Sequence, residues 1–411
     1  MQSVSAVCRA TVVTLLVAAG SSLATAQITV GPPGSGATYQ EISSAVAAAP
    51  VGASIFVQGG TYQPFAVSQG VSIVAMGSVP CIVAIPAGVT TAAIEVSQVA
   101  VGQVVRITGL SLDSSTSADL PRIHLHQCAG RVELVQVASP PMMPSASPYE
   151  IQEPVLLIED CAAVELEGCV ISGSNPSSQQ AWQRGQDGMV VVGSRVWCNA
   201  SALRGGHGYE GYAGAAVQAT AGSFLHLSRT SAVGGGGGAH FGFYWWDIYG
   251  FPGEEGIKIA DTVLVLAGGP GNLVEGGWGI QVSSFDWSGG GAAVLVHSGG
   301  VVRYTPDSVL VPGPDGNGQT TVPAVLAIAA GSVAIAEPAT RATLAVEPST
   351  PQVGQVVDIS SSGDAQAMHA VFAAFVGTAP AVLPVAQYLH VDPNQALLVA
   401  VTGLDATGVG N

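Results

Sequence analysis

Two stretches of the chain place histidine and glutamate side chains at a spacing that could support acid–base chemistry. IHLHQCAGRVELV and LLIEDCAAVELEG can be aligned so that Cys128 matches Cys161, and His126 then matches Glu159. If the two stretches are neighbouring strands, these side chains lie about 4.8 Å apart. A histidine beside a carboxylate can accept and donate protons. His126 and Glu159 are therefore candidate catalytic residues, and the alternative is a solvated face without chemistry.

The alternation of apolar and polar residues predicts which of these side chains share a face. Ile123 and Leu125 are predicted to point into the core. Arg122, His124 and His126 would then point outward from the same strand. The outward face would carry the candidate chemistry, and the inward face would be packed.

Three glutamates form a second polar row in the same alignment. After a one-residue gap, Glu133 matches Glu165, and Glu167 shares the face of Glu165. Stacked like charges repel each other unless a cation or Arg131 compensates them. Carboxylate oxygens are calcium ligands, so Glu133, Glu165 and Glu167 are candidate metal ligands, and Glu165 is a further candidate for catalysis. The alternative is a solvated row that needs no cofactor, and calcium is the ion to test.

A different candidate site is the insertion AHFGFYWWDIYGFPGEE, residues 239–255. Aromatic residues make up 6% of the chain, so their concentration here is unusual. Aromatic faces stack on sugar rings, and a long loop could present them as a platform. The alternative is that the loop folds down and buries its rings over the strands. The candidate ligand-binding residues are Tyr244, Trp245, Trp246 and Tyr249, and Trp278, Phe285 and Trp287 would extend either arrangement.

Glycine clusters punctuate the second half of the chain. Gly205-Gly206 and Gly234 to Gly238 could be mistaken for phosphate-binding loops. Such a loop needs the N-terminus of a helix behind it, whereas strand-like segments follow here. We therefore interpret the clusters as turns.

The elements that position these residues follow a repeat. The two aligned stretches begin 33 residues apart, and later units keep the strands while the loops vary in length. Because no hairpin signals join the strands, the repeat predicts coils stacked on one another. Each coil would pair in parallel with the next and bury its apolar side chains against it.

The stretch TYQEISSAVAAAPVGASIFVQGGTY, at residues 38–62, begins the repeat. Thr38 and Glu41 have the spacing of a capping box, which predicts a helix from Thr38 to Ala49. A strand and a glycine turn follow. Since the first coil of a stack has a bare edge, the helix is predicted to cover it.

This order of helix, strand and GGTY, with the coils that follow, resembles the right-handed parallel β-helix superfamily, the pectin-lyase-like proteins. The resemblance covers about three quarters of the chain and implies an all-β solenoid. Members include polysaccharide lyases, glycoside hydrolases, esterases and non-catalytic surface proteins. The hydrolases carry an Asp-Asp pair, which this chain lacks, and a His-Gly motif, which occurs here only as His207-Gly208 in a glycine cluster. The lyases use clustered aspartates for calcium with an arginine or lysine base; Asp187 with Arg184 is the nearest match and looks isolated.

The composition excludes several classes of protein. The chain has 411 residues and a formal charge of −16 with one lysine, Lys258, which disfavours nucleic acid and anionic membranes as partners. Residues 1–26 have the charge, apolar run and Ala-Thr-Ala ending of a signal peptide, so we expect a secreted protein that lies outside the cell or at its surface. The run is too short to insert stably in a membrane. Five cysteines after residue 26 do not form a disulfide scaffold. Cys128 and Cys161 are expected to stack as small apolar residues in neighbouring coils, and the alternative in an exported protein is a disulfide between them.

The chain is predicted to contain a β-helix at 27–336, a Pro/Thr/Ser-rich linker at 337–354 and a small β-module at 355–411. The missing family motifs favour a non-catalytic protein that binds a polysaccharide or cell-surface glycan or serves as a structural surface protein. We expect the protein to be a monomer. One alternative is a carbohydrate-active enzyme, either a polysaccharide lyase or a glycoside hydrolase, with the His126, Glu159 and Glu165 face as its site. The other is a purely structural spacer without any ligand.

Overall fold

The computed structural model describes residues 27–86, 91–113, 121–141, 153–175, 184–208, 211–241, 248–267, 271–281, 288–327 and 332–336, together with seven strands between 343 and 410. Nearly all regular structure in these residues is β, and the one helix among them, α1, spans Ile42–Ala48. Among the described residues, no helix has the length and hydropathy needed to cross a membrane.

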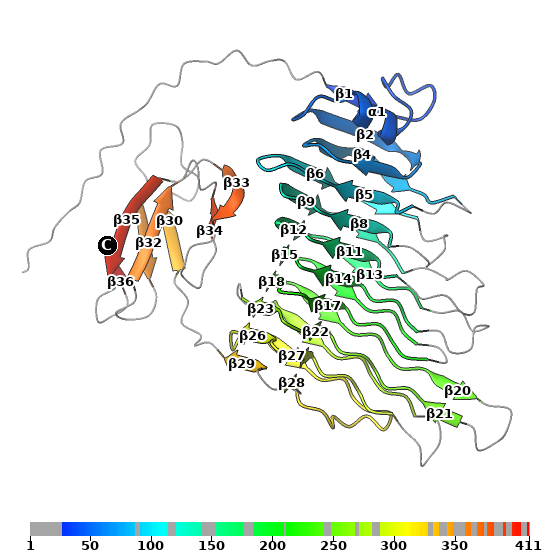
Figure 1. Ribbon diagram of the computed structural model, residues 1–411, viewed down its shortest axis with the longest axis vertical. Helices are drawn as coiled ribbons and strands as arrows, with labels where there is room; N and C mark the ends of the chain where they lie inside the picture. The colour runs from blue at the N-terminus through cyan, green and yellow to red at the C-terminus, as the bar shows by residue number, and fades with distance from the viewer. Residues whose placement is uncertain are drawn as a thin grey trace, which may run out of the picture.

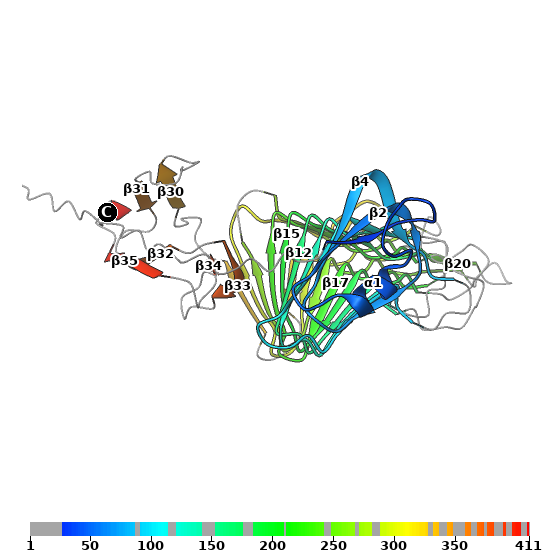
Figure 2. The same ribbon diagram turned by 90° about the horizontal axis from the view of Figure 1, so that it is seen from above.

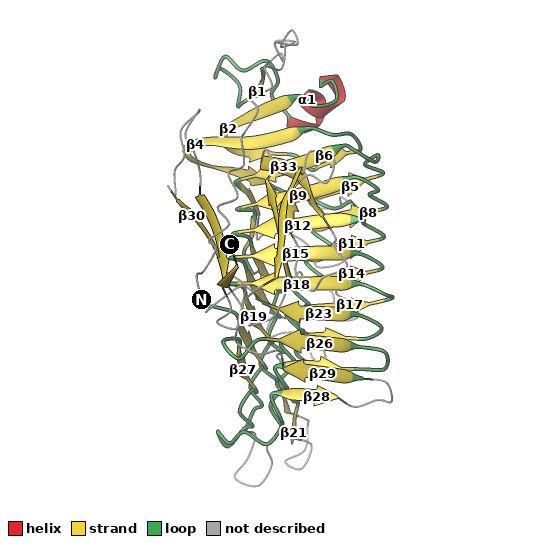
Figure 3. Ribbon diagram, turned by 90° about the vertical axis from the view of Figure 1, so that its left-hand side faces the viewer, coloured by secondary structure: helices red, strands yellow, loops and turns green. Residues whose placement is uncertain are grey.

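The strands stack as successive coils of a parallel β-helix, which confirms the predicted fold class (Figure 1). A typical coil contributes one strand to a nine-stranded sheet and two to an 18-stranded sheet. Figure 3 shows strands of the larger sheet in a regular ladder. The nine-stranded sheet contains β3 Phe65–Val67, β5 Ile94–Ser97, β8 Ile123–His126, β11 Leu156–Glu159, β14 Met189–Val192, β17 Val217–Thr220, β22 Ile257–Ile259, β25 Val294–Val296 and β28 Val325–Ala327.

The 18-stranded sheet follows two columns of strands along the stack. The first column is β1 Ile28–Val30, β2 Ser54–Tyr62, β4 Ser72–Val83, β6 Val104–Thr108, β9 Arg131–Val135, β12 Ala163–Glu167, β15 Arg195–Asn199, β18 Phe224–Ser228, β23 Val263–Leu266, β26 Val301–Tyr304 and β29 Val333–Ala336. The second column continues from the ends of β2 and β4 through β7 Leu110–Leu112, β10 Ala138–Ser139, β13 Val170–Ser172, β16 Ala202–Arg204, β19 Ser231–Val233, β24 Leu273–Glu275 and β27 Val309–Val311.

Apolar side chains of the same register position stack through the interior of the coils. Ile94, Ile123, Leu156, Met189 and Val217 are paired neighbours on five successive strands, and each is fully buried. Burial of one such side chain contributes about 1.5–3 kcal/mol. Since each one is covered by the coils on either side, the strands are stable as a stack.

The bend between the two sheets repeats from coil to coil. Gln98, Gln127 and Asp160 occupy equivalent positions after β5, β8 and β11, with φ of 55°, 54° and 50°. This left-handed conformation turns the chain out of one sheet and into the next, and Gly193 takes the same place after β14 with φ 58°. The outward faces of β8 and β9 therefore belong to different sheets.

Polar side chains satisfy the backbone inside these bends. The amide of Cys161 donates to Ser194 Oγ at 2.8 Å, and Ser194 Oγ donates to Val192 O at 2.8 Å. In a second column of bends, the amide of Cys169 donates to Ser201 Oγ at 3.1 Å. The cysteines thus occupy positions that serine fills one coil later.

Helix α1 covers the first coil, as predicted, but it begins later than expected. The helix lies beside β1 and β2 at the first coil (Figure 1). Its residues Ile42, Ala45 and Val46 are buried. The predicted capping box is wrong: Glu41 is the N-cap residue and no side chain caps the helix. Instead, Glu41 Oε2 accepts a hydrogen bond from the amide of Gln63 at 3.0 Å.

The glycine clusters are extended chain, not turns, which corrects the interpretation above. Residues 205–208, 234–238 and 276–280 lead away from the sheets, and residues 211–216, 251–256 and 288–293 return; we call these segments the glycine arms. Seen down the stack, the coils superpose, and chain paths extend toward β20 (Figure 2). The returning arms hydrogen-bond to the leaving arms, for example from Gly235 N to Gly214 O at 2.9 Å and from Glu254 N to Gly235 O at 3.0 Å.

Close backbone contact explains why the arms need glycine. A Cβ atom on Gly235 would lie 2.0 Å from the carbonyl oxygen of Gly206, and one on Gly277 would lie 1.8 Å from that of Gly235. Both glycines have ordinary φ values, so the missing side chain is what matters. β20 Ala239–Phe241 and β21 Ile248–Gly250 form an antiparallel pair beyond one set of arms.

The strands after residue 342 pair differently from the coils. β30 Thr343–Glu347, β31 Asp358–Ser362 and β36 Val409–Gly410 form one antiparallel sheet. β32 Met368–Ala373 pairs with β35 Leu397–Gly403, and β33 Val376–Ala381 pairs with β34 Leu389–Val391, also antiparallel. β30 lies inside the segment predicted as a linker, so that part of the segment is a strand.

Candidate functional site

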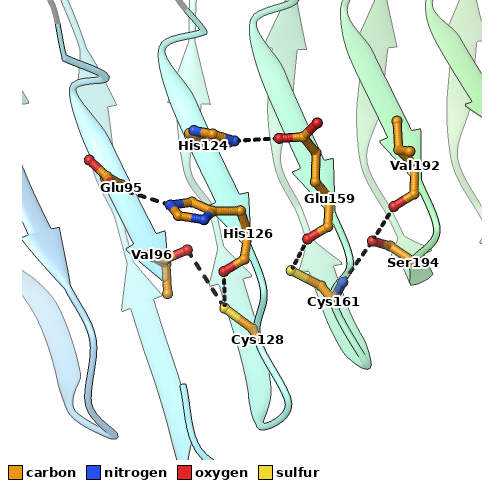
Figure 4. A network of polar contacts seen from close by, with 9 residues as sticks. All are labelled: Glu95, Val96, His124, His126, Cys128, Glu159, Cys161, Val192 and Ser194. Carbon is orange, nitrogen blue, oxygen red and sulfur yellow. Dashed lines mark hydrogen bonds and ion pairs between the residues drawn. The ribbon is translucent and has the colours of Figure 1, made fainter. Parts of the chain in front are cut away.

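Four titratable side chains meet on the outer face of the nine-stranded sheet. Glu95 lies on β5, His124 and His126 on β8, and Glu159 on β11; we call them the His–Glu cluster (Figure 4). His124 Nε2 lies 2.8 Å from Glu159 Oε2, and His126 Nε2 lies 3.1 Å from Glu95 Oε1. The two imidazole rings stack with their centroids 4.5 Å apart.

The cluster confirms the predicted register and corrects the predicted contact. His126 does align with Glu159, but its ring contacts Glu95 on the opposite neighbour. Glu159 contacts His124, two residues away on the same strand face. Candidate residues His126 and Glu159 are therefore adjacent in the sheet without forming the proposed acid–base pair.

Each imidazole of the His–Glu cluster contacts one carboxylate on a neighbouring strand. The two Nε2 atoms point in opposite directions along the sheet, each toward its own carboxylate (Figure 4). The four side chains are partly exposed, between 23% and 40%. The two rings stack on each other, and each Nε2 atom is engaged by a carboxylate.

The predicted glutamate row lies on the 18-stranded sheet and is neutralised by arginine. Glu133 and Glu165 are aligned neighbours, as predicted. Arg131 contacts both carboxylates, at 2.8 Å from Glu133 and 2.6 Å from Glu165, and Arg106 lies 2.5 Å from Glu133. The expected compensation by Arg131 is therefore present, and Arg106 adds to it.

Because Glu165 faces outward from a different sheet, the structure does not bring it together with His126 and Glu159. Glu167 is exposed at the end of β12. Within the described residues, no group of three or more histidine, cysteine, aspartate or glutamate side chains is arranged to hold a metal ion. The carboxylates of Glu133 and Glu165 are occupied by guanidinium groups, so a cation would have to compete with arginine.

Arg122 departs from its predicted outward position. It is 1% exposed, and its guanidinium donates at 2.7 Å to both Ser139 Oγ and Pro140 O. It also donates to Ser174 Oγ of the next coil at 3.3 Å. Burial lowers the pKa of Arg122 to about 10. Arg122 precedes β8, so the alternation of inward and outward side chains along that strand does not extend to it.

The structure assembles a charged cluster that the sequence did not indicate. Lys258 contacts Glu254 and lies 3.2 Å from Glu255 Oε2. Arg184 lies 3.3 Å from Asp187 Oδ1 and 3.8 Å from Glu254 Oε1. We call these five residues the Lys258 cluster. Arg184 and Asp187, which looked isolated in the sequence, thus meet a lysine and two glutamates from a later coil.

Burial shifts the proton affinities in the Lys258 cluster. Desolvation, helped by the positive charge of Arg184, lowers the pKa of Lys258 to about 8. Desolvation also raises the pKa of Glu255. The partners come from positions about 70 residues apart in the sequence, and the intervening insertion has no repeat period. No local sequence motif could therefore have predicted the contact between Arg184 and Glu254.

An aromatic patch lies on three consecutive leaving arms. The ring of Trp278 lies over Gly236, where a Cβ atom would be 2.4 Å from Trp278 Cε2, and reaches His207 with centroids 4.6 Å apart. The amide of Gly236 donates to His207 Nδ1 at 2.7 Å. We call His207, Gly236 and Trp278 the tryptophan patch. Trp278 is 48% exposed although its ring is held in place.

A second exposed ring lies on the returning arms. Tyr212 is 54% exposed and meets Phe251 edge to face, with centroids 5.1 Å apart. Of the candidate binding residues in the insertion, Tyr244, Trp245 and Trp246 lie outside the described residues, as does the side chain of Tyr249. Phe285 and Trp287 also lie outside them. Trp278, predicted as an extension of the platform, is the member that the structure describes.

Comparison with known proteins gives little guidance. No family model and no curated protein sequence matches the chain. Among solved structures, YbhC of Escherichia coli matches with 13% sequence identity over 79% of this chain and 88% of its own, at a TM-score of 0.20. A likeness at this level carries no conclusion about function.

Proposed function

We propose that the protein is a secreted, non-catalytic glycan-binding member of the pectin-lyase-like superfamily, and that the tryptophan patch binds the sugar. The exposed ring of Trp278 carries the proposal. It is flat, held against Gly236 and His207, and half open to solvent. A fixed aromatic face loses little conformational entropy when a sugar ring stacks on it.

The titratable groups support a binding role over catalysis. The carboxylates of the His–Glu cluster each contact a histidine, and those of Glu133 and Glu165 contact an arginine. The signal-like residues 1–26, which lie outside the described residues, support the proposal of export. The charge of −16 favours neutral over anionic polysaccharides, because a polyuronate would be repelled at low salt.

The test is a panel of neutral and acidic polysaccharides, measured by isothermal titration calorimetry with and without calcium. We expect a neutral glycan to bind, Trp278→Ala to weaken binding at least about tenfold, equivalent to 1.4 kcal/mol, and Trp278→Phe to retain most of it. Val101→Ala, at a side chain that is 82% exposed on another coil, is the control. Equal affinity in Trp278→Ala would refute the patch, and no binding at all would favour the structural spacer.

The Lys258 cluster supports a second candidate function, a polysaccharide lyase. A lysine whose pKa is lowered to about 8 can act as a base, and the superfamily resemblance implies lyases with an arginine or lysine base. The check is absorbance from unsaturated products, with reducing-end release measured in parallel for hydrolysis. Product formation abolished by Lys258→Met would replace the binding proposal with the lyase. Hydrolysis abolished by His126→Ala or Glu165→Gln would instead identify the face predicted from the sequence.

A further inference from the structure

Cys128 and Cys161 occupy the same bend on neighbouring coils. Each follows a residue in the left-handed conformation, Gln127 with φ 54° and Asp160 with φ 50°. The strands before them are in register, and the amide of Ala162 donates to Cys128 O at 2.8 Å. Equivalent positions on neighbouring coils are about 4.8 Å apart. This separation lies within the Cα–Cα range of about 4.4–6.8 Å that disulfides span.

The two thiols also affect each other's proton affinity. The neighbouring Cys161 lowers the pKa of Cys128, while Cys128 and burial raise the pKa of Cys161. Cys128 is therefore the more acidic thiol of the pair, and the thiolate is the form that attacks a disulfide. Both residues are buried, at 0% and 1% exposure, so they meet an oxidant while the coils assemble.

We propose that Cys128 and Cys161 form a disulfide that fastens the coil of β8 to the coil of β11. The bond would close a loop of 33 residues and lie next to the His–Glu cluster at the ends of β8 and β11, since Cys128 donates to His126 O and Cys161 donates to Glu159 O (Figure 4). The proposal rests on the exported location proposed above, because disulfides persist in oxidising compartments. It does not depend on glycan binding.

The reaction is thiol–disulfide exchange with a disulfide oxidant such as oxidised glutathione. The Cys128 thiolate attacks one sulfur of the oxidant and releases the other as a thiol. The Cys161 thiolate then attacks the mixed disulfide at Cys128 and releases the second thiol. The two cysteines lose two protons and two electrons in total, and the oxidant gains them.

The remaining cysteines are not aligned with one another. Cys81 aligns with Leu110, and Cys198 aligns with Leu166. The amide of Cys169 is bound by Ser201, its counterpart one coil later. Cys128 and Cys161 are thus the only pair in register among the five described cysteines.

The experiment counts alkylated thiols by intact mass. The chain without residues 1–26 is refolded with oxidised glutathione, denatured without reductant and treated with iodoacetamide. Of its five cysteines, we expect three to be alkylated, and all five after reduction. Peptide mapping without reductant should recover Cys128 linked to Cys161. Five alkylated thiols after oxidative refolding would overturn the proposal.

Two serine variants keep the test independent of folding defects. Cys161→Ser copies Ser194, its counterpart one coil later, and should give four alkylated thiols with or without reduction. Cys169→Ser copies Ser201 and should give two before reduction and four after it. Oxidation should raise Tm by a few degrees in the wild type and in Cys169→Ser, but not in Cys161→Ser. A bond that is lost in Cys169→Ser and retained in Cys161→Ser would contradict the assignment.

Discussion

At the scale of single residues, side chains pair diagonally across neighbouring strands. Glu95 aligns with His124 and contacts His126, while Glu159 aligns with His126 and contacts His124. The sequence alignment predicted the register correctly because the coil repeat fixes which residues are neighbours. It could not predict the contacts, since these depend on how each side chain leans along its strand.

Arg131 is predicted to stabilise the fold through its two glutamate partners. Its guanidinium is 11% exposed and compensates Glu133 and Glu165, so Arg131→Met leaves two poorly solvated carboxylates without their shared partner. We expect the free energy of unfolding to fall by about 3–5 kcal/mol, measured by urea denaturation.

The control is Arg106→Met, because Arg106 pairs with Glu133 but is 53% exposed. We expect the free energy of unfolding of Arg106→Met to fall by less than about 1 kcal/mol. Adding Glu133→Gln and Glu165→Gln to Arg131→Met should recover most of the loss. A small effect of Arg131→Met alone would contradict the account of the glutamate row.

His207 gives the pH prediction. Burial and the nearby charge of Arg204 lower its pKa below 6.5, and its Nδ1 accepts a hydrogen bond in the neutral form. As pH falls below 6.5, the unfolded chain binds this proton before the folded chain does, so stability falls. In urea titrations between about pH 7.5 and 5.5, the wild type should lose more stability than His207→Gln. If the free energy of unfolding changes with pH in the same way in both proteins, His207 does not contribute to the pH dependence of stability.

At the scale of elements, the glycine arms show where sequence patterns mislead. Glycine runs usually mark turns, and the clusters were interpreted in that way. In the structure, Gly206, Gly235 and Gly277 instead let extended backbones touch across coils. A sequence cannot distinguish these roles, because both require the absence of a side chain. The neighbour that would clash comes from another coil.

Alanine substitution tests this role directly. Gly235→Ala would place a Cβ atom 2.0 Å from Gly206 O, so the arms must move apart. We expect a loss of about 1–3 kcal/mol or more in the free energy of unfolding. Gly289→Ala is the matched control, since nothing lies within 4 Å of its added Cβ atom. Equal stability of the two variants would argue against close packing of the arms.

At the scale of the whole molecule, stacking decides which residues meet. The solenoid was predictable because apolar periodicity and repeat spacing carry over from one coil to the next. The Lys258 cluster was not, because it joins Arg184 and Asp187 to residues that lie beyond an insertion of irregular length. The tryptophan patch likewise combines residues of three coils.

The first coil needs its cover to keep the stack from pairing with other chains. Ile42 of α1 is fully buried, so Ile42→Asp should detach the helix and expose the first strands. We expect concentration-dependent aggregation in light scattering. Ser43→Asp, on the exposed side of the same helix, should behave like the wild type. Monodisperse Ile42→Asp protein would show that α1 is not required as a cover.

The central claim is that a glycan stacks on Trp278, and ¹⁹F NMR of protein labelled with 5-fluorotryptophan tests it most directly. Trp278→Phe assigns the resonance of Trp278, and Trp197, which is 4% exposed, serves as the buried reference. On titration with a glycan that binds, we expect the Trp278 resonance to shift to saturation while that of Trp197 stays in place. Saturated binding with an unchanged Trp278 resonance would contradict the account.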